Sequence, residues 1–341
     1  MERVVTIDDV ARAAGVGKGT VDRVLHSRGR VAPETRERVL QCIEQLDYKP
    51  NKAARMLAKT RAYRIAVCFH DKEAEFWKQV QDGVDKASEE YKQMGVQVIP
   101  FILPEIHIPS QMNVIRQVID EGFDGLAIVP YYSDEVVRLL NEAVERGIQV
   151  VTFNNREQGA RARYVGTDGV QSGRTAGRLM SMLAPANGRY IVFSPGSLMM
   201  QMDERLDGFQ QVVRQYRQDM TCCGVYRFME NYDEMYRFTL DKIRKADVDA
   251  IYTTYSAVSV VGEAIRDSGQ EKRITVVGHD LTPSTIELIR NGYIDASVGQ
   301  DPERQGYASI DKICRKLLTD EEIVDEFTKI SIAVAENVDY L

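Results

Sequence analysis

The sequence has few cysteines and no long hydrophobic run, and both absences limit its class. No apolar run approaches the roughly 20 residues that a membrane-spanning helix needs. The five cysteines are an odd number and show no Cys-x-x-Cys spacing, so we expect reduced thiols and no metal site. The N-terminal segment contains acidic residues and lacks an apolar core, which argues against a signal peptide. We therefore expect a cytoplasmic protein without membrane contact.

Signatures of common enzyme classes are also missing. The chain lacks Gly-x-Ser-x-Gly, a phosphate-binding loop, Gly-x-Gly-x-x-Gly and His-Glu-x-x-His. We therefore expect no enzymatic activity and no cofactor.

Charge is distributed unevenly along the 341 residues. Residues 1–61 contain 13 Lys and Arg against 8 Asp and Glu, whereas the remaining 280 contain 31 against 43, so a net charge of -7 hides a basic N-terminal part. A small basic region on an acidic body is typical of a protein whose N-terminal part binds nucleic acid.

Helical signals follow one another in this basic part. Thr6 with Asp8 and Asp9 predicts a helix start, and Gly15 predicts its end. A second short helix fits residues 17–25, and a third begins near Pro33. Two short helices separated by a tight turn are a helix-turn-helix pattern, in which the second helix enters the major groove of DNA.

Residues 6–58 resemble the DNA-binding domain and hinge of the lactose/galactose repressor family. The shared motifs are "TIDDVARAAGV", Thr20-Val21 with Arg23-Val24, "V-PETRERV" and "LDYKPN-AAR-LA". The resemblance implies a helix-turn-helix domain over residues 1–48 and a hinge helix over 49–61 that lies in the minor groove, where Leu57 would wedge into a base step. It further implies a homodimer on a pseudo-palindromic double-stranded DNA operator. The expected DNA contacts are Thr6, Gly17, Lys18, Gly19, Thr20, Asp22, Arg23, His26, Arg30, Asn51, Ala54 and Leu57.

The recognition segment departs from the family pattern. Gly17 replaces the usual Ser, Gly19 has no base-reading side chain, and Asp22 stands where a Ser is usual. An acid can accept a hydrogen bond from cytosine or orient Arg23. The alternatives are that the glycines only add flexibility and that Lys18 is a solvated surface lysine.

From residue 62 onward, short apolar runs alternate with helical stretches. This alternation predicts parallel sheets covered on both faces, and nine such units are too many for one sheet, so two lobes are expected. Residues 62–335 resemble two-lobed periplasmic sugar-binding proteins through "FW--V--GV", "ERLDGF", "VVGHDLTP" and "ASVGQDPERQG". The fold class is thus a small all-α head and hinge helix joined to an α/β body of two Rossmann-like lobes. We expect one lobe over residues 62–163 and 297–324, and the other over 164–296 and 325–341.

In such folds a ligand binds between the lobes at the carboxyl ends of the strands. The expected ligand contacts are Phe76, Trp77, Asn154, Asn155, Asp203, Tyr255, Asp280 and Gln300. The aromatic pair would stack on a sugar ring, and the amides and carboxylates would bind hydroxyl groups. The alternatives are core packing for the aromatic pair, a helix cap for Asp280 and an ordinary exposed amide for Gln300.

Position 203 weakens the family pattern. Many relatives have an effector-binding Arg two residues before the Arg of "ERLDGF", and this chain has Asp203 there. Two carboxylates without a cation would favour a neutral or amino sugar over a phosphorylated one. A shift of two residues would instead give Arg205 that role. His70 and His279 are expected to be structural.

The sequence therefore predicts a transcription regulator, of the repressor type, whose DNA affinity is controlled by a small sugar or polyol. One alternative is the same regulator fold sensing a non-sugar ligand or a partner protein. The others are a sugar-binding module or an enzyme without a regulatory role.

Overall fold

A computed structural model describes residues 5, 7–25, 31–46, 62–70, 75–195, 199–228, 231–269 and 274–341. The chain divides into two compact units, Met1–Arg61 and Ala62–Leu341. The hinge helix expected over 49–61 lies outside the described residues. So do the expected DNA contacts Thr6, His26, Arg30, Asn51, Ala54 and Leu57.

The first unit contains the three expected helices. They are α1 (Ile7–Ala14), α2 (Lys18–Leu25) and α3 (Pro33–Gln45). Gly15, with φ of 65°, ends α1 as predicted, and Val16 N–H closes the turn by donating to Ala11 O at 3.0 Å. The three helices share one small apolar core, which includes Val10, Val21 and Val39. This core leaves the polar face of α2 exposed.

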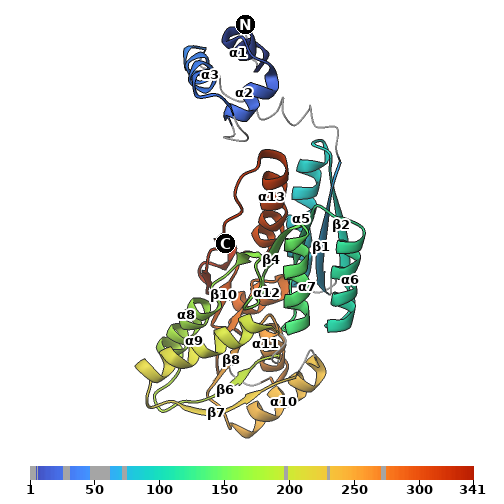
Figure 1. Ribbon diagram of the computed structural model, residues 1–341. Helices are drawn as coiled ribbons and strands as arrows, with labels where there is room; N and C mark the ends of the chain where they lie inside the picture. Colours follow the sequence, from blue (N-terminus) through green and yellow to red (C-terminus); the bar gives the residue numbers. More distant parts are fainter. Residues whose placement is uncertain are drawn as a thin grey trace. The chain divides into compact units, whose positions relative to one another are not determined.

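The second unit contains two six-stranded sheets (Figure 1), and we call the lobes built on them lobe N and lobe C. The sheet of lobe N has the order β11-β5-β4-β3-β1-β2 and is parallel throughout. Its strands are β1 (Tyr63–His70), β2 (Val96–Leu103), β3 (Gly125–Ile128), β4 (Gln149–Phe153), β5 (Arg163–Gly166) and β11 (Glu326–Phe327). Its helices are α5 (Glu75–Lys92), α6 (Ile108–Asp120), α7 (Asp134–Glu145) and α13 (Pro302–Thr319).

The sheet of lobe C has the order β12-β10-β9-β8-β6-β7, with only the short β12 antiparallel. Its strands are β6 (Arg189–Phe193), β7 (Thr221–Tyr226), β8 (Ala250–Thr253), β9 (Thr275–His279), β10 (Ala296–Gly299) and β12 (Ser331–Ala333). Its helices are α8 (Gly169–Leu183), α9 (Met200–Tyr216), α10 (Tyr232–Lys245), α11 (Val258–Asp267), α12 (Pro283–Arg290) and the 3₁₀ turn η1 (Val338–Tyr340).

The strand pairing shifts the expected lobe limits by a few residues. β5 pairs with β4, so the chain leaves lobe N after Gly166 and not at 163. Because β10 pairs with β9, the chain returns to lobe N after Gly299 and not after 296. Because β11 pairs with β5, the last crossing follows Phe327 and not 324. A sequence reveals that a short apolar strand is present, but it does not reveal which of the two sheets the strand joins.

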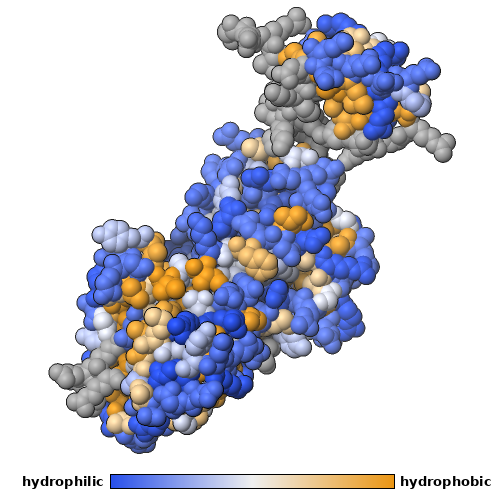
Figure 2. Space-filling model, turned by 90° about the vertical axis from the view of Figure 1, so that its left-hand side faces the viewer, coloured by the Kyte–Doolittle hydropathy of each residue, from blue (hydrophilic) through white to orange (hydrophobic). Residues whose placement is uncertain are grey.

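The surface of the body is mostly hydrophilic, and apolar side chains gather in the lower half of the view in Figure 2. Exposed large hydrophobic residues include Met182, Leu183 and Tyr216 at the ends of α8 and α9 in lobe C. Among the described residues, no helix has the length and apolar character needed to cross a membrane.

Glycines allow two helix pairs to pack closely, α5 with α13 and α8 with α9. A Cβ at Gly173 of α8 would lie 2.0 Å from the backbone O of Arg205 in α9. We predict that Gly173→Ala lowers the free energy of unfolding of the body by about 2–3 kcal/mol, because the helices must move apart. Gln171→Ala, an exposed change on the same helix, should stay within about 0.5 kcal/mol in the same denaturant titration. Equal effects of the two changes would contradict the close packing.

Candidate ligand-binding site and DNA-binding head

Polar residues follow the carboxyl ends of strands in both lobes. Asn154 and Asn155 follow β4, Asp280 follows β9 and Gln300 follows β10, and all four are buried. The structure links these expected ligand contacts into one hydrogen-bonded network, in agreement with the rule that parallel sheets place their sites at strand ends. Asn154 and Asp280 have φ of 59° and 74°, a strained conformation that tends to occur at functional positions.

Gln300 is the centre of this network. Its Nε2 donates to Asp280 Oδ1 at 2.6 Å. Its Oε1 accepts from Thr167 Oγ1 at 3.1 Å and from Asn154 Nδ2 at 3.3 Å. Gln300 is therefore held on several sides by protein groups, and the alternative of an exposed amide is excluded by its 2% exposure.

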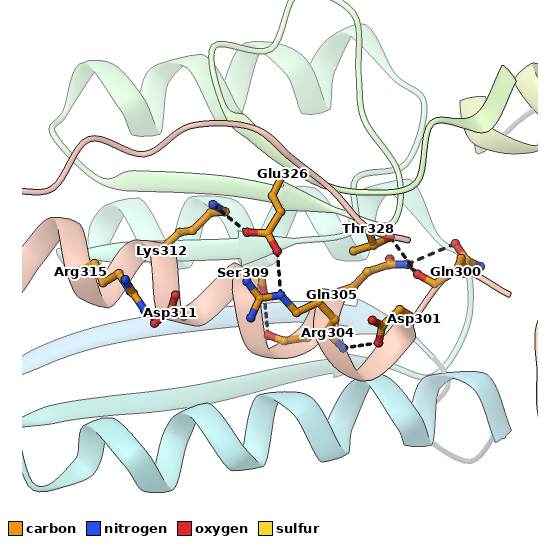
Figure 3. A network of polar contacts seen from close by, with 11 residues as sticks. Gln300, Asp301, Arg304, Gln305, Ser309, Asp311, Lys312, Arg315, Glu326 and Thr328 are labelled. Carbon is orange, nitrogen blue, oxygen red and sulfur yellow. Dashed lines mark hydrogen bonds and ion pairs between the residues drawn. The ribbon is translucent and has the colours of Figure 1, made fainter. Parts of the chain in front are cut away.

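The backbone of Gln300 also joins the chain crossings between the lobes (Figure 3). Its carbonyl O accepts from Gln305 Nε2 at 2.8 Å and from Thr328 Oγ1 at 2.9 Å. Thr328 N–H donates to Gly166 O at 2.9 Å. Thr167, Gln300 and Thr328 belong to the three different crossings, so one polar cluster ties all three together. Two residues of α13 hold β11 in place. Glu326 of β11 accepts a hydrogen bond from Arg304 and forms an ion pair with Lys312, so β11 is fixed to the helix.

Asn155 connects lobe N to the first turn of α9 in lobe C. Its Nδ2 donates to Pro130 O at 2.6 Å, and its Oδ1 accepts from the backbone N–H of Gln201 at 3.2 Å. One partner belongs to lobe N and the other to lobe C, so Asn155 links the two lobes.

Arg205 is the largest fully buried side chain of the described residues. Its Nη1 donates to Thr254 O at 2.7 Å, while its Nε and Nη2 have no hydrogen-bond partner in the described part of the chain. Those two atoms form one edge of the guanidinium group, the edge that binds two oxygens side by side. A buried cation with free donors costs free energy unless a ligand satisfies it.

Asp203 does not join this network, and a buried cation, Arg205, is present where none was expected from the sequence. Its side chain is 41% exposed and lies 3.6 Å from Arg227. Positions 203 and 205 are about 200° apart around a helix, so α9 can turn only one of them inward. The buried residues Gln201, Met202 and Leu206 lie on the same face as Arg205.

Arg205 also influences the titration of its neighbours. Burial raises the pKa of Asp280, and this is opposed by Arg205 and by the hydrogen bond from Gln300. Burial lowers the pKa of His279 well below its ordinary value, and the charge of Arg205 lowers it further. His279 contacts Tyr252 OH at 2.9 Å and Ser172 Oγ at 3.4 Å, so it is the structural histidine that was predicted.

Further buried polar atoms have no hydrogen-bond partner among the described residues. They include His70 Nδ1 in lobe N and Ser194 Oγ, Gln201 Oε1, Thr253 Oγ1 and Thr254 Oγ1 in lobe C. Each of these residues lies at the end of a strand or in the first turn of α9. Burial lowers the pKa of His70 to about 4, so its ring is neutral near pH 7. From the sequence, His70 was considered only as a structural residue and the others were not singled out, because a Ser, Thr or Gln near the end of a strand is an ordinary occurrence.

The aromatic candidates have partners within the protein. Trp77 stacks on Phe69 at 5.8 Å and lies 4.6 Å from the His70 ring, and Phe76 meets Trp77 edge-on at 5.0 Å. Tyr255 OH donates to Met235 Sδ at 3.6 Å. Trp77 and His70 therefore form one aromatic group, whereas Tyr255 is directed towards α10.

The expected recognition helix begins at Lys18, with Gly17 as the residue that precedes it. Gly17, Lys18, Gly19, Asp22 and Arg23 are exposed, and Thr20 is half-buried. Within the head, Lys18 Nζ lies 2.7 Å from Asp8 Oδ2, and Arg23 Nε donates to Gly19 O at 2.9 Å. Polar groups on one exposed helix face are what major-groove contact requires.

Comparison with known families agrees with both units. Residues 6–51 match the family described as bacterial regulatory proteins, lacI family, and residues 65–321 match the periplasmic binding protein domain. The chain joins a lacI-family DNA-binding domain to a body that belongs to the periplasmic binding protein domain family. It is a DNA-binding transcription regulator with a periplasmic-binding-protein-like body, as the sequence predicted.

Named relatives are regulators of the same kind. The HTH-type transcriptional regulator CelR of Thermobifida fusca is 27% identical over 292 residues, which cover 81% of this chain and 82% of CelR. Catabolite control protein A of Streptococcus mutans is 31% identical over 134 residues, 39% of each chain. The glucose-galactose binding protein GanP of Geobacillus stearothermophilus has a similar fold, with a TM-score of 0.73 at 21% identity over 82% of this chain and 99% of GanP.

Glu157 lies beside the lobe contact made by Asn155. It is 7% exposed, accepts from Asn155 Nδ2 at 3.3 Å, and burial raises its pKa to about 7. The folded state therefore holds a proton that the unfolded state releases near pH 4.3, so this residue lowers stability as the pH rises from about 4 to about 7.

We predict that Glu157→Gln is as stable as the unmodified protein near pH 4 and more stable by about 1–3 kcal/mol at pH 8, because the amide cannot ionise. Denaturant titrations across this pH range measure the difference. Glu89→Gln, a change at a carboxylate that is 73% exposed, is the control. Parallel pH profiles for the Glu157 variant and the unmodified protein would contradict the prediction.

Proposed function

We propose that this regulator binds a neutral sugar or polyol between its lobes and that this ligand sets its affinity for a DNA operator. The observation that carries the proposal is the fully buried guanidinium group of Arg205, whose Nε and Nη2 lack partners among the described residues. It lies in the same buried region as Asp280, whose Oδ1 is already used by Gln300.

A hydroxyl group both donates and accepts hydrogen bonds, so it needs both kinds of partner. Arg205 offers donors, Asp280 and Gln201 Oε1 offer acceptors, and Ser194 and Thr254 offer either. A phosphate or carboxylate only accepts and would meet the charge of Asp280. The positive charge of Arg205 balances that carboxylate, so the earlier reason to favour an amino sugar no longer holds.

The names of similar proteins support a sugar. GanP is a glucose-galactose binding protein, and a fold neighbour from Burkholderia graminis was solved with D-arabinose, at a TM-score of 0.74 and 18% identity over 83% of this chain. Another neighbour, from Actinobacillus succinogenes, contains D-allose, at a TM-score of 0.73 and 16% identity over 82% of this chain. These four sugars are the first probes to test.

For the DNA side, we propose a cytoplasmic homodimer that binds a pseudo-palindromic operator, with one head in each half-site. The exposed face of α2 supports major-groove contact by Lys18, Asp22 and Arg23. Minor-groove contact by Ala54 and Leu57 rests on the family resemblance. The protein has no catalytic role in this proposal.

The ligand prediction concerns Arg205→Met. Loss of two charge-assisted hydrogen bonds, worth about 1.5–3 kcal/mol each, should weaken sugar binding by about 100-fold or more. Calorimetry with D-glucose, D-galactose, D-arabinose and D-allose and their phosphorylated forms measures this. Arg214→Met, an exposed change on the same helix, should bind normally. The proposal would be rejected if a phosphorylated form bound most tightly or if Arg205→Met bound the sugars fully. Binding of other compound classes only would favour a non-sugar sensor.

The DNA prediction concerns Lys18→Ala. If Lys18 leaves Asp8 to read a guanine, its removal relaxes the preference at one base pair per half-site and costs about 1–3 kcal/mol there. Selection of bound DNA from a random pool measures the preference. Arg12→Ala, at an exposed position of α1, should weaken binding equally for all sequences or not at all. If the selected sequences do not change, Lys18 is a solvated surface lysine that reads no base.

A further inference from the structure

The start of α5 in lobe N contacts the start of α12 in lobe C. Glu75 Oε1 accepts from Ser284 Oγ at 2.7 Å, and Glu75 Oε2 accepts from the backbone N–H of Ser284 at 3.2 Å. One carboxylate thus binds two donors on the other lobe. Its negative charge also lies at the positive end of the α12 dipole, which strengthens the contact.

A second contact lies one helical turn along α5. Gln79 Nε2 donates to the backbone O of Leu281 at 3.1 Å. Glu75 and Gln79 are four residues apart, so they share one face of α5. Their partners flank the segment that leads from Asp280 into α12, and this segment is therefore held against lobe N at two points.

These contacts are separate from the Gln300 cluster and share none of its hydrogen bonds. In the lobe N sheet, β1 is three strand positions from β5, where the first crossing begins. With strands about 4.8 Å apart, this separation is roughly 14 Å. Opening the lobes about the crossings would separate α5 from α12 and break both contacts, whereas the Gln300 cluster at the hinge would move little.

We propose that Glu75 and Ser284 form a latch that holds the lobes closed and keeps Asp280 in position for a ligand that neither residue touches. For its effect on affinity, this inference rests on the proposed sugar site. The latch is a positioning device, and its effect on lobe closure can be measured without a ligand.

The single tryptophan makes that measurement specific. Trp77 is 8% exposed and lies two residues after Glu75. In the full chain, Glu75→Ala and Ser284→Ala should each raise the quenching of Trp77 fluorescence by acrylamide. Hydrogen exchange of the peptide covering residues 280–286 should also accelerate. The double variant should add little to either single one, because each change removes the same contact.

Glu303→Ala is the matched control. Glu303 pairs with Lys86 at 3.1 Å, and this pair joins α13 to α5 within lobe N. Its loss removes a carboxylate contact of α5 without affecting the lobe contact, so quenching and exchange should stay unchanged. Glu75→Gln retains an acceptor oxygen and should lie between Glu75→Ala and the unmodified protein.

With the four named sugars as probes, the latch variants should show about tenfold weaker binding, which corresponds to 1.4 kcal/mol, mainly through faster release. Unchanged quenching and exchange in Glu75→Ala and Ser284→Ala would overturn the latch, whatever the sugars do. Additive effects in the double variant would also overturn it. If quenching and exchange respond as expected but no sugar binds the unmodified protein, the latch stands and the proposed sugar site fails.

Discussion

The arrangement of the two lobes depends on the hydrogen bonds of Gln300. Its side chain accepts from Thr167 and donates to Asp280, and its carbonyl O accepts from Thr328, so one buried residue joins all three chain crossings to the strand-end carboxylate. Because unpaired polar groups in this interior would cost about 1–3 kcal/mol each, the set is stable only when complete. Gln300 was expected to contact a ligand, but its partners make it primarily the residue that positions Asp280 and fixes the hinge.

The hinge also bears on the proposed ligand site, whose groups come from both lobes. Arg205 and Thr254 belong to lobe C, and His70 belongs to lobe N. In that proposal, their relative positions depend on the three chain crossings and on the contact between Glu75 and Ser284. A ligand that touches both lobes shifts the balance between open and closed forms only through its different affinity for the two.

Sequence reasoning gave the two-unit organisation, the head helices and most strands, because these follow from local periodicity and turn residues. It also placed Asn154, Asp280 and Gln300 correctly at strand ends. Arg205 was held only as an alternative, because choosing between positions 203 and 205 requires the phase of α9, which is set by packing against α8. The role of Gln300 could not be predicted either, since its partner Thr167 lies 133 residues away.

The places where local rules fail are themselves informative. A buried Arg with unused donors, and buried hydroxyls at Ser194 and Thr254 without partners in the described chain, lower stability wherever they occur. Elsewhere in the body, buried polar side chains such as Gln111 and Ser297 are hydrogen-bonded. A cost concentrated at strand ends, beside a fully bonded hinge, is the pattern expected of a site that a polar ligand completes, because natural chains accept such violations mainly where function requires them. Ligand binding should therefore stabilise the closed form of the body. Because the chain joins the head to lobe N at residue 62, a movement of lobe N on closure would be passed to the head.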